Sequence, residues 1–201
     1  PSHIGVAFDT HAPTFRHKAF ADYKANREKQ PEEINIAVPY CKKIIQGFGI
    51  PVIELDGYEA DDLIGTLARL AGNQYQTFMM TPDKDYAQLV NEHTFLYKPA
   101  FMGNGVDILG IKEVLEKFNI NEVHQVIDVL GLKGDAVDNI PGVPGIGDKT
   151  ASKLLKEYGS LEGIVSNRHL LTGHVKKKIE QFGAQGLFSK ELATIKLDCP
   201  I

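Results

Sequence analysis

The first half of the chain alternates short apolar runs with longer segments in which apolar residues recur every three or four positions. The short runs cover residues 4–8, 51–55 and 77–80, and a weaker one covers residues 94–97. Runs of this length are typical of buried strands in a parallel sheet, and the segments between them are typical of amphipathic helices. This alternation predicts an α/β fold with a parallel sheet.

The pattern changes in the second half, where strand-like runs stop and helical spacing continues. Further helices are expected over residues 149–158 and 173–182, and a stretch rich in glycine and proline, residues 141–147, precedes them. We therefore expect an α/β core over residues 1–121 and a small all-helical domain over residues 122–201.

Composition narrows the class of protein. With 43% hydrophobic residues in 201, the chain can bury a real core. No apolar run approaches the roughly 20 residues of a membrane span, and no signal peptide is visible. Cys41 and Cys199 lack the spacing of a metal site, so we expect reduced thiols in a cytoplasmic protein. The chain opens without Met, directly on a strand, which indicates a piece of a longer protein.

Acidic residues follow the ends of the first three predicted strands. They are Asp9, then Asp56, Glu59, Asp61 and Asp62, then Asp83 and Asp85. The carboxyl ends of parallel strands meet at one edge of a sheet, where ligands bind, so we expect these side chains to converge. Asp135 and Asp138 add a pair whose spacing places both on one face of a helical turn.

This set of carboxylates has two readings. Any one of them could simply cap a helix or offset its dipole, and the last pair could belong to a solvated loop. Together, without paired His or Cys, they suit a hard cation, which favours Mg²⁺ or Mn²⁺ over zinc. Their number predicts two ions, which typically lie about 3.5–4 Å apart and act on a phosphate.

Two further segments indicate contact with phosphate. Residues 12–30 mix basic and aromatic side chains, and Lys24 and Arg27 would project the same way on a helix. Positive charge attracts a nucleic-acid backbone and rings stack on bases, although a solvated amphipathic helix is the usual alternative. In residues 142–151, Gly145 and Gly147 free the backbone for a tight turn before a helix, which predicts a helix-hairpin-helix that grips phosphates.

Seen together, these segments resemble the 5′-nuclease domains of bacterial DNA polymerase I, within the wider flap endonuclease and phage 5′-exonuclease family. The matching segments are VAFD at 6–9, FRH at 15–17, YKANR at 23–27, GYEADD at 57–62, TPDKD at 81–85, GD at 134–135, DN at 138–139 and the hairpin at 142–151. The resemblance implies a PIN-like or Rossmann-like parallel-sheet core, a basic helical arch at about residues 12–33, and the helical domain with its helix-hairpin-helix.

The resemblance also implies roles for the matched residues. One divalent ion would be held by Asp9, Glu59 and Asp61, with Asp62 and Asp83 close by, and a second would be held or oriented by Asp85, Asp135 and Asp138. The expected catalytic residues are Lys24, Arg27, Asp83 and Asp85. The expected nucleic-acid contacts are Arg16, Tyr23, Lys24, Arg27, Gly145, Gly147, Lys149 and Thr150, with the Tyr23 ring stacking on a base. A monovalent cation bound by backbone carbonyls is expected at the hairpin.

The resulting hypothesis is a structure-selective, metal-dependent 5′-nuclease that removes flaps and RNA primers in DNA replication and repair. Its partners would be 5′-flap or nicked DNA, RNA primer–DNA hybrids and a C-terminal polymerase domain, in the bacterial cytoplasm near the nucleoid and not at a membrane. Family members begin with an earlier strand that carries another metal-binding aspartate, and this sequence lacks it. A non-catalytic module that binds branched DNA is therefore the alternative, and a Mg²⁺-dependent phosphatase is a third.

Overall fold

The computed structural model describes residues 1–99 and 105–201. The strands are β1 (Val6–Ala7), β2 (Val52–Ile53), β3 (Thr77–Met80), β4 (Thr94–Pro99) and β5 (Val106–Leu109). The helices are α1 (Phe15–Ala19), α2 (Glu32–Gly47), α3 (Ala60–Ala71), α4 (Ile111–Phe118), α5 (Gln125–Lys133), α6 (Asp148–Tyr158), α7 (Leu161–Ser166) and α8 (Gly173–Ala193), with 3-10 turns η1 (Asp85–Leu89) and η3 (Arg168–Leu170). Within these ranges no helix is both long and apolar enough to span a bilayer.

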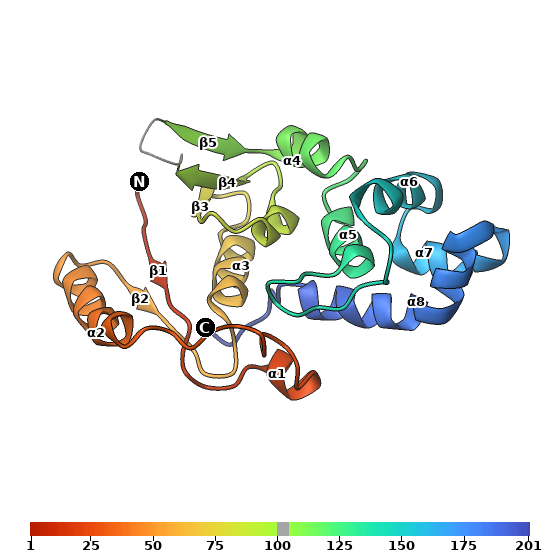
Figure 1. The fold of residues 1–201 in the computed structure, drawn as a ribbon. Helices are drawn as coiled ribbons and strands as arrows, with labels where there is room; N and C mark the ends of the chain where they lie inside the picture. The colour runs from red at the N-terminus through yellow and green to blue at the C-terminus, as the bar shows by residue number, and fades with distance from the viewer. Residues whose placement is uncertain (100–104) are drawn as a thin grey trace.

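The strands form two small sheets with α3 between them (Figure 1). β1 pairs with β2 in parallel, β3 pairs with β4 in parallel, and β5 adds to β4 in the antiparallel sense. The prediction of an α/β fold with parallel strand pairs is therefore confirmed. β5 was not predicted, because it is an edge strand in which only Leu109 is buried, so its sequence lacks an apolar run.

The helices α5 to α8 form a separate layer, which lies to the right in Figure 1. The buried core continues into this layer, from Met79 and Leu96 of the sheet to Val126, Leu155 and Ile179 of the helices. After α8 the chain returns to α3, where Arg69 Nε donates to the Leu197 carbonyl at 2.7 Å. The helical layer is thus attached to α3 by packing and by the C-terminal segment.

Two sequence predictions about helices were wrong. The basic segment 12–33 is not a helical arch, because helix α1 ends at Ala19 and residues 21–26 form turns, with Lys24 at a φ of 56°. The last helix does not stop at residue 182 but continues to Ala193. Its interior glycines obscured the pattern, and at Gly186 an added Cβ would lie 2.8 Å from Val143, so glycine there permits close packing.

Candidate active site

The first group of acids lies at the start of α3. Glu59 is the N-cap residue, and its backbone N–H donates to Asp62 at 3.1 Å, which closes a capping box. The backbone N–H of Ala60 donates to Asp9 Oδ1 at 2.8 Å, so the end of β1 is tied to the same helix start. Local helix capping therefore brings Asp9, Glu59 and Asp62 together from two strand ends.

Arg16 holds this group together through its guanidinium, which donates to both oxygens of Asp62 at 2.8 Å and to Glu59 at 3.2 Å. It also donates to the main-chain carbonyls of Leu192 and Thr194, each at 2.8 Å. Arg16 is 2% exposed and Asp62 is fully buried, so their ion pair lies in the interior. Through Arg16 it connects α1, the start of α3 and the C-terminal end of α8.

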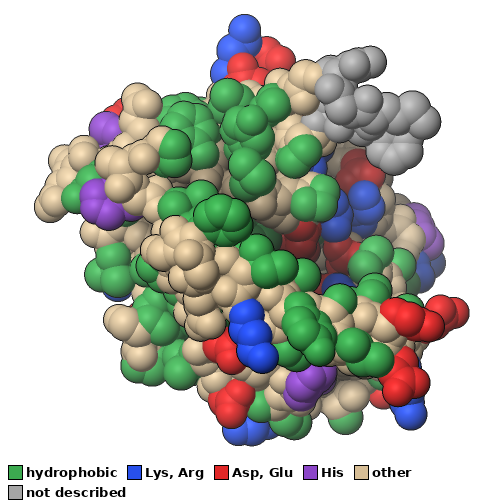
Figure 2. Space-filling view, turned by 90° about the vertical axis from the view of Figure 1, so that its left-hand side faces the viewer, with side chains coloured by type: hydrophobic (Ala, Val, Ile, Leu, Met, Phe, Trp, Pro, Cys, Tyr) green, Lys and Arg blue, Asp and Glu red, His purple; other side chains and the backbone are tan. Residues whose placement is uncertain are grey.

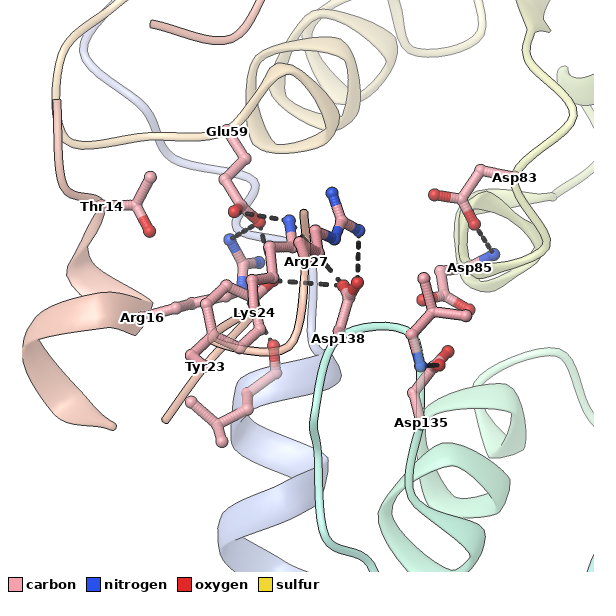
Figure 3. A network of polar contacts seen from close by, with 12 residues as sticks. Thr14, Arg16, Tyr23, Lys24, Arg27, Glu59, Asp83, Asp85, Asp135 and Asp138 are labelled. Carbon is pink, nitrogen blue, oxygen red and sulfur yellow. Dashed lines mark hydrogen bonds and ion pairs between the residues drawn. The ribbon is translucent and has the colours of Figure 1, made fainter. Parts of the chain in front are cut away.

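Glu59 also has partners on the turn that follows α1. The Tyr23 hydroxyl donates to it at 2.9 Å and Lys24 Nζ donates at 2.7 Å. Figure 3 shows these side chains converging on the Glu59 carboxylate. Because these donors come from different segments, they hold the Glu59 carboxylate in a fixed orientation.

Asp61 differs from its acidic neighbours in its surroundings. Its Oδ1 atom is buried and, in the part of the chain that the structure describes, has no hydrogen-bond partner. Burial raises the pKa of Asp61 to about 7, and the nearby charge of Arg16 only partly opposes this. A buried carboxylate oxygen without a donor is costly and is the kind of atom that a bound cation would satisfy.

The carboxylates of Asp9, Asp61 and Asp83 lie near one phenol. Burial raises the pKa of the Tyr86 hydroxyl. Four nearby carboxylates raise it further: Asp61, Asp83, Asp9 and Asp62. The three strand ends named in the sequence analysis therefore face one region of the molecule.

Asp83 and Asp85 follow β3 on a tight turn. The Asp83 carboxylate accepts the backbone N–H of Asp85 at 2.9 Å, and Thr81 Oγ1 accepts that of Asp83 at 3.1 Å. Burial raises the pKa of Asp85 to about 6. Asp85 Oδ1 lies 3.2 Å from Lys84 Nζ but has no well-aligned hydrogen-bond donor among the described residues.

Asp135 and Asp138 lie on the loop after α5, which two glycines hold tightly. An added Cβ on Gly134 would lie 2.4 Å from the Ile140 carbonyl oxygen, and one on Gly142 would lie 2.3 Å from a backbone nitrogen. Both glycines also have positive φ, so each position requires glycine both for its backbone conformation and for lack of space. The prediction that the pair lies on one face of a helical turn was wrong: Asp135 instead pairs with Ile140 in an antiparallel bridge.

Basic side chains connect the loop acids to the core acids (Figure 3). Lys24 lies 2.7 Å from Glu59 and 3.7 Å from Asp138, and Arg27 also pairs with Asp138. Lys84 pairs with Asp135 on its other side. Although burial opposes it, the pKa of Asp135 is lowered, because Lys84 and a backbone N–H donate to it. Figure 2 shows acidic and basic side chains lining a hollow in this face of the molecule.

The second predicted element, the hairpin, lies between α5 and α6. Gly145 has a φ of +88° and Gly147 is the N-cap of α6. Lys149 and Gly145 are exposed, and Thr150 is half-buried. His174 and Lys178 of α8 lie beside Gly145, with atoms 3.6 and 3.7 Å from where its Cβ would be. The sequence analysis missed these two residues, although the lysine run at 176–178 was a signal for basic charge there.

Comparison with protein families identifies the arrangement. The family described as 5′-3′ exonuclease, N-terminal resolvase-like domain matches residues 1–119, and that described as 5′-3′ exonuclease, C-terminal SAM fold matches residues 121–201. The chain belongs to the 5′-3′ exonuclease family. The predicted relationship to this family is therefore confirmed.

Relatives support membership in the 5′-3′ exonuclease family. DNA polymerase I of Bacillus subtilis (strain 168) is 41% identical over 203 residues, which cover 100% of this chain and 23% of that protein. The 5′-3′ exonuclease of Aquifex aeolicus (strain VF5) is 40% identical over 168 residues, 83% of this chain and 56% of that protein. The chain thus spans about a quarter of the length of the polymerase that it matches.

Solved structures share the fold. The T5 5′-exonuclease with bound divalent metal ions (zinc) superposes with a TM-score of 0.77 at 22% identity, covering 93% of this chain and 71% of that one. A bacteriophage T5 flap endonuclease variant, described as a pseudo-enzyme-product complex with DNA and metal ions, also has a TM-score of 0.77 at 22% identity, over 96% of this chain and 73% of that one.

Three residue roles predicted for this member of the 5′-3′ exonuclease family need correction. Arg16 is buried against Asp62 and cannot reach nucleic acid, and Asp62 has both oxygens occupied by Arg16 and backbone donors, so its role is structural. The Tyr23 ring is 3% exposed, so it cannot stack on a base in this conformation. Sequence spacing could not show these burials, because the partners lie more than 30 residues away along the chain.

The remaining carboxylates fit a divalent cation. Among residues 1–99 and 105–201, no three His, Cys, Asp or Glu side chains form a ready metal cage. However, Asp61 and Asp85 each carry a buried oxygen without a hydrogen-bond partner, and both have raised pKa values. Hard oxygen donors of this kind suit Mg²⁺ or Mn²⁺. The roles of Lys24, Arg27, Lys149 and Thr150, and the monovalent cation at the hairpin, stay predictions.

Proposed function

We propose that this domain is a metal-dependent 5′-nuclease that cuts 5′ flaps and RNA primers in DNA replication and repair, within a DNA polymerase I. The observation that carries the proposal is that Asp61 and Asp85, at the strand ends of a 5′-3′ exonuclease-family fold, each have one buried oxygen without a hydrogen-bond partner among the described residues. The relatives that are polymerases support a polymerase domain as the partner in the full-length chain.

The mechanism divides the site into three parts. Divalent ions, when bound, supply positive charge that offsets the charge of the phosphodiester during its hydrolysis. Asp9, Asp61, Asp83 and Asp85 would hold them, and Glu59 lies nearby, oriented by its hydrogen-bond donors. Lys24 and Arg27, which pair with Glu59 and Asp138, would bind the phosphate next to the cut, and hydrolysis by water would leave the 5′-phosphate on the product.

The hairpin provides the second contact with the substrate. The exposed N-terminus of α6, with Gly145, Gly147 and Lys149, presents backbone N–H groups and positive charge. These groups grip the duplex backbone without reading bases. This arrangement predicts selectivity for the structure of the DNA and not for its sequence.

The test uses the longest natural polypeptide that contains this sequence, a 5′-flap oligonucleotide and Mg²⁺. Asp83→Ala with Asp85→Ala should abolish cleavage, by a factor of about 10³ or more, because both carboxylates face the cation site. Glu116→Ala with Asp198→Ala removes the same charge from exposed positions and should cleave normally. Unchanged cleavage by the first variant would refute the proposal, and flap binding without any cleavage by the parent protein would favour the DNA-binding alternative.

A further inference from the structure

Lys84 lies between two acids that belong to different parts of the fold. Its Nζ atom is 3.2 Å from Asp85 Oδ1, at the end of β3, and it is ion-paired with Asp135 Oδ2, on the loop after α5. Although burial opposes its charge, the pKa of Lys84 is raised, because Asp135 and Asp85 stabilise the ammonium. One lysine therefore holds these two carboxylates of the core and the helical layer together.

The same arrangement recurs on the other side of the hollow. Lys24 lies between Glu59 of the core and Asp138 of the loop. In both places a lysine ammonium takes the position between two carboxylates that a cation would take. In each acid pair the lysine thus offsets one of the two negative charges from within the chain.

We propose that Lys84 is an internal counter-ion that a divalent ion at Asp85 and Asp135 must displace. This inference rests on the proposed function, because it assumes that the acids bind metal. Carboxylates that lie against an ammonium cannot also bind a bare divalent ion at short range without displacing it, since the two cations repel. The charge of Lys84 therefore lowers metal affinity, while it holds the acids together in the ion-free protein.

The surroundings of Lys84 allow this exchange. Its side chain is 42% exposed and unbranched, so the ammonium can swing into solvent when a stronger cation arrives. Arg16 is the contrasting case: it is 2% exposed and donates five hydrogen bonds, two of them to main-chain carbonyls. Arg16 is a permanent part of the interior, and Lys84 is the exchangeable cation.

The first test is calorimetric titration of metal-free protein with Mn²⁺ alone. Lys84→Met should bind Mn²⁺ at least about tenfold more tightly than wild type, because the competing charge is gone. Lys84→Arg keeps the charge and should bind like wild type. Lys112→Met removes one charge from an exposed i,i+4 pair and should also bind like wild type.

A second measurement follows Lys84 in the wild-type protein, and it needs only the conservative Lys84→Arg variant for assignment. The side-chain signal of Lys84, assigned by its absence from Lys84→Arg, is followed by NMR in the wild-type protein during a Mg²⁺ titration. It should move to the position of a solvated lysine as the site fills. Equal or weaker Mn²⁺ affinity of Lys84→Met, or an unmoved Lys84 signal at saturation, would overturn the counter-ion role alone. Absence of any metal uptake by the wild type would overturn it together with the proposed function.

Discussion

Replacement of Arg16 tests whether the interior ion pair holds the acid cluster together. In Arg16→Met a similar volume remains, but Asp62 loses both of its charged hydrogen bonds while staying fully buried. Its remaining donors are the backbone N–H groups of Glu59 and Lys196. Leaving one member of a buried pair without its partner costs about 3–5 kcal/mol, because the remaining charge is uncompensated.

The other hydrogen bonds lost in Arg16→Met add little to this free-energy cost. Glu59 keeps Tyr23 and Lys24 as donors, so its charge stays compensated. The carbonyls of Leu192 and Thr194 each lose one donor, at about 1 kcal/mol apiece, which lies within the uncertainty of the main term. We therefore expect a loss of about 3–5 kcal/mol in the free energy of unfolding.

The assay is urea unfolding followed by circular dichroism, with a chelator present. Adding Asp62→Asn to Arg16→Met should recover about 1–2 kcal/mol, because the uncompensated charge disappears and the amide oxygen still accepts one of the two backbone N–H groups. Lys112→Met, at an exposed pair, should stay within about 0.5 kcal/mol of wild type. A loss below about 1 kcal/mol for Arg16→Met, or no recovery in the double variant, would show that the interior pair does not carry this stability.

Three further outcomes follow from the site. Gly159→Ala, at a positive φ with open space around the added Cβ, should lower the free energy of unfolding by about 1 kcal/mol. Gly134→Ala has a similar φ but a clash with the Ile140 carbonyl, so its loss should be several times larger. Equal losses in urea unfolding would contradict the close approach at Gly134. Because burial raises the pKa of Asp61 from 3.8 to about 7, the folded metal-free protein binds the extra proton, so its stability should fall as pH rises from about 4 to 7, by up to about 1.4 kcal/mol per pH unit from this group. Asp61→Asn should flatten that slope in urea titrations at several pH values, and an unchanged slope would rule out Asp61 as its source. Tyr23→Phe should lower the free energy of unfolding by about 1–2 kcal/mol in urea, because it removes the hydroxyl bond to Glu59 while the buried ring stays packed, and unchanged stability would contradict this structural role.

Sequence reasoning found the acids and several of the basic residues, but it did not show that Arg16, Lys24 and Arg27 pair with those acids. Strand β3 could be predicted because it is a short apolar run. Strand β5 could not, since it is exposed along most of its length and its sequence includes Asp107. The spacing of Lys24 and Arg27 suggested a helix, but contacts with Asp138, more than 100 residues away, select a turn instead. Spacing along the chain reports local periodicity, and it carries no information about such distant partners.

The C-terminal segment has a consequence for how the molecule comes apart. Residues 194–199 lie along α3, where Lys196 donates its backbone N–H to Asp62 and Cys199 donates to Thr66. The two family models match residues 1–119 and 121–201 separately, yet the C-terminal segment of the second region is hydrogen-bonded to α3 of the first. The two regions should therefore unfold in a single cooperative transition. The helical layer cannot separate from the core unless the contacts of this segment with Asp62 and Thr66 break.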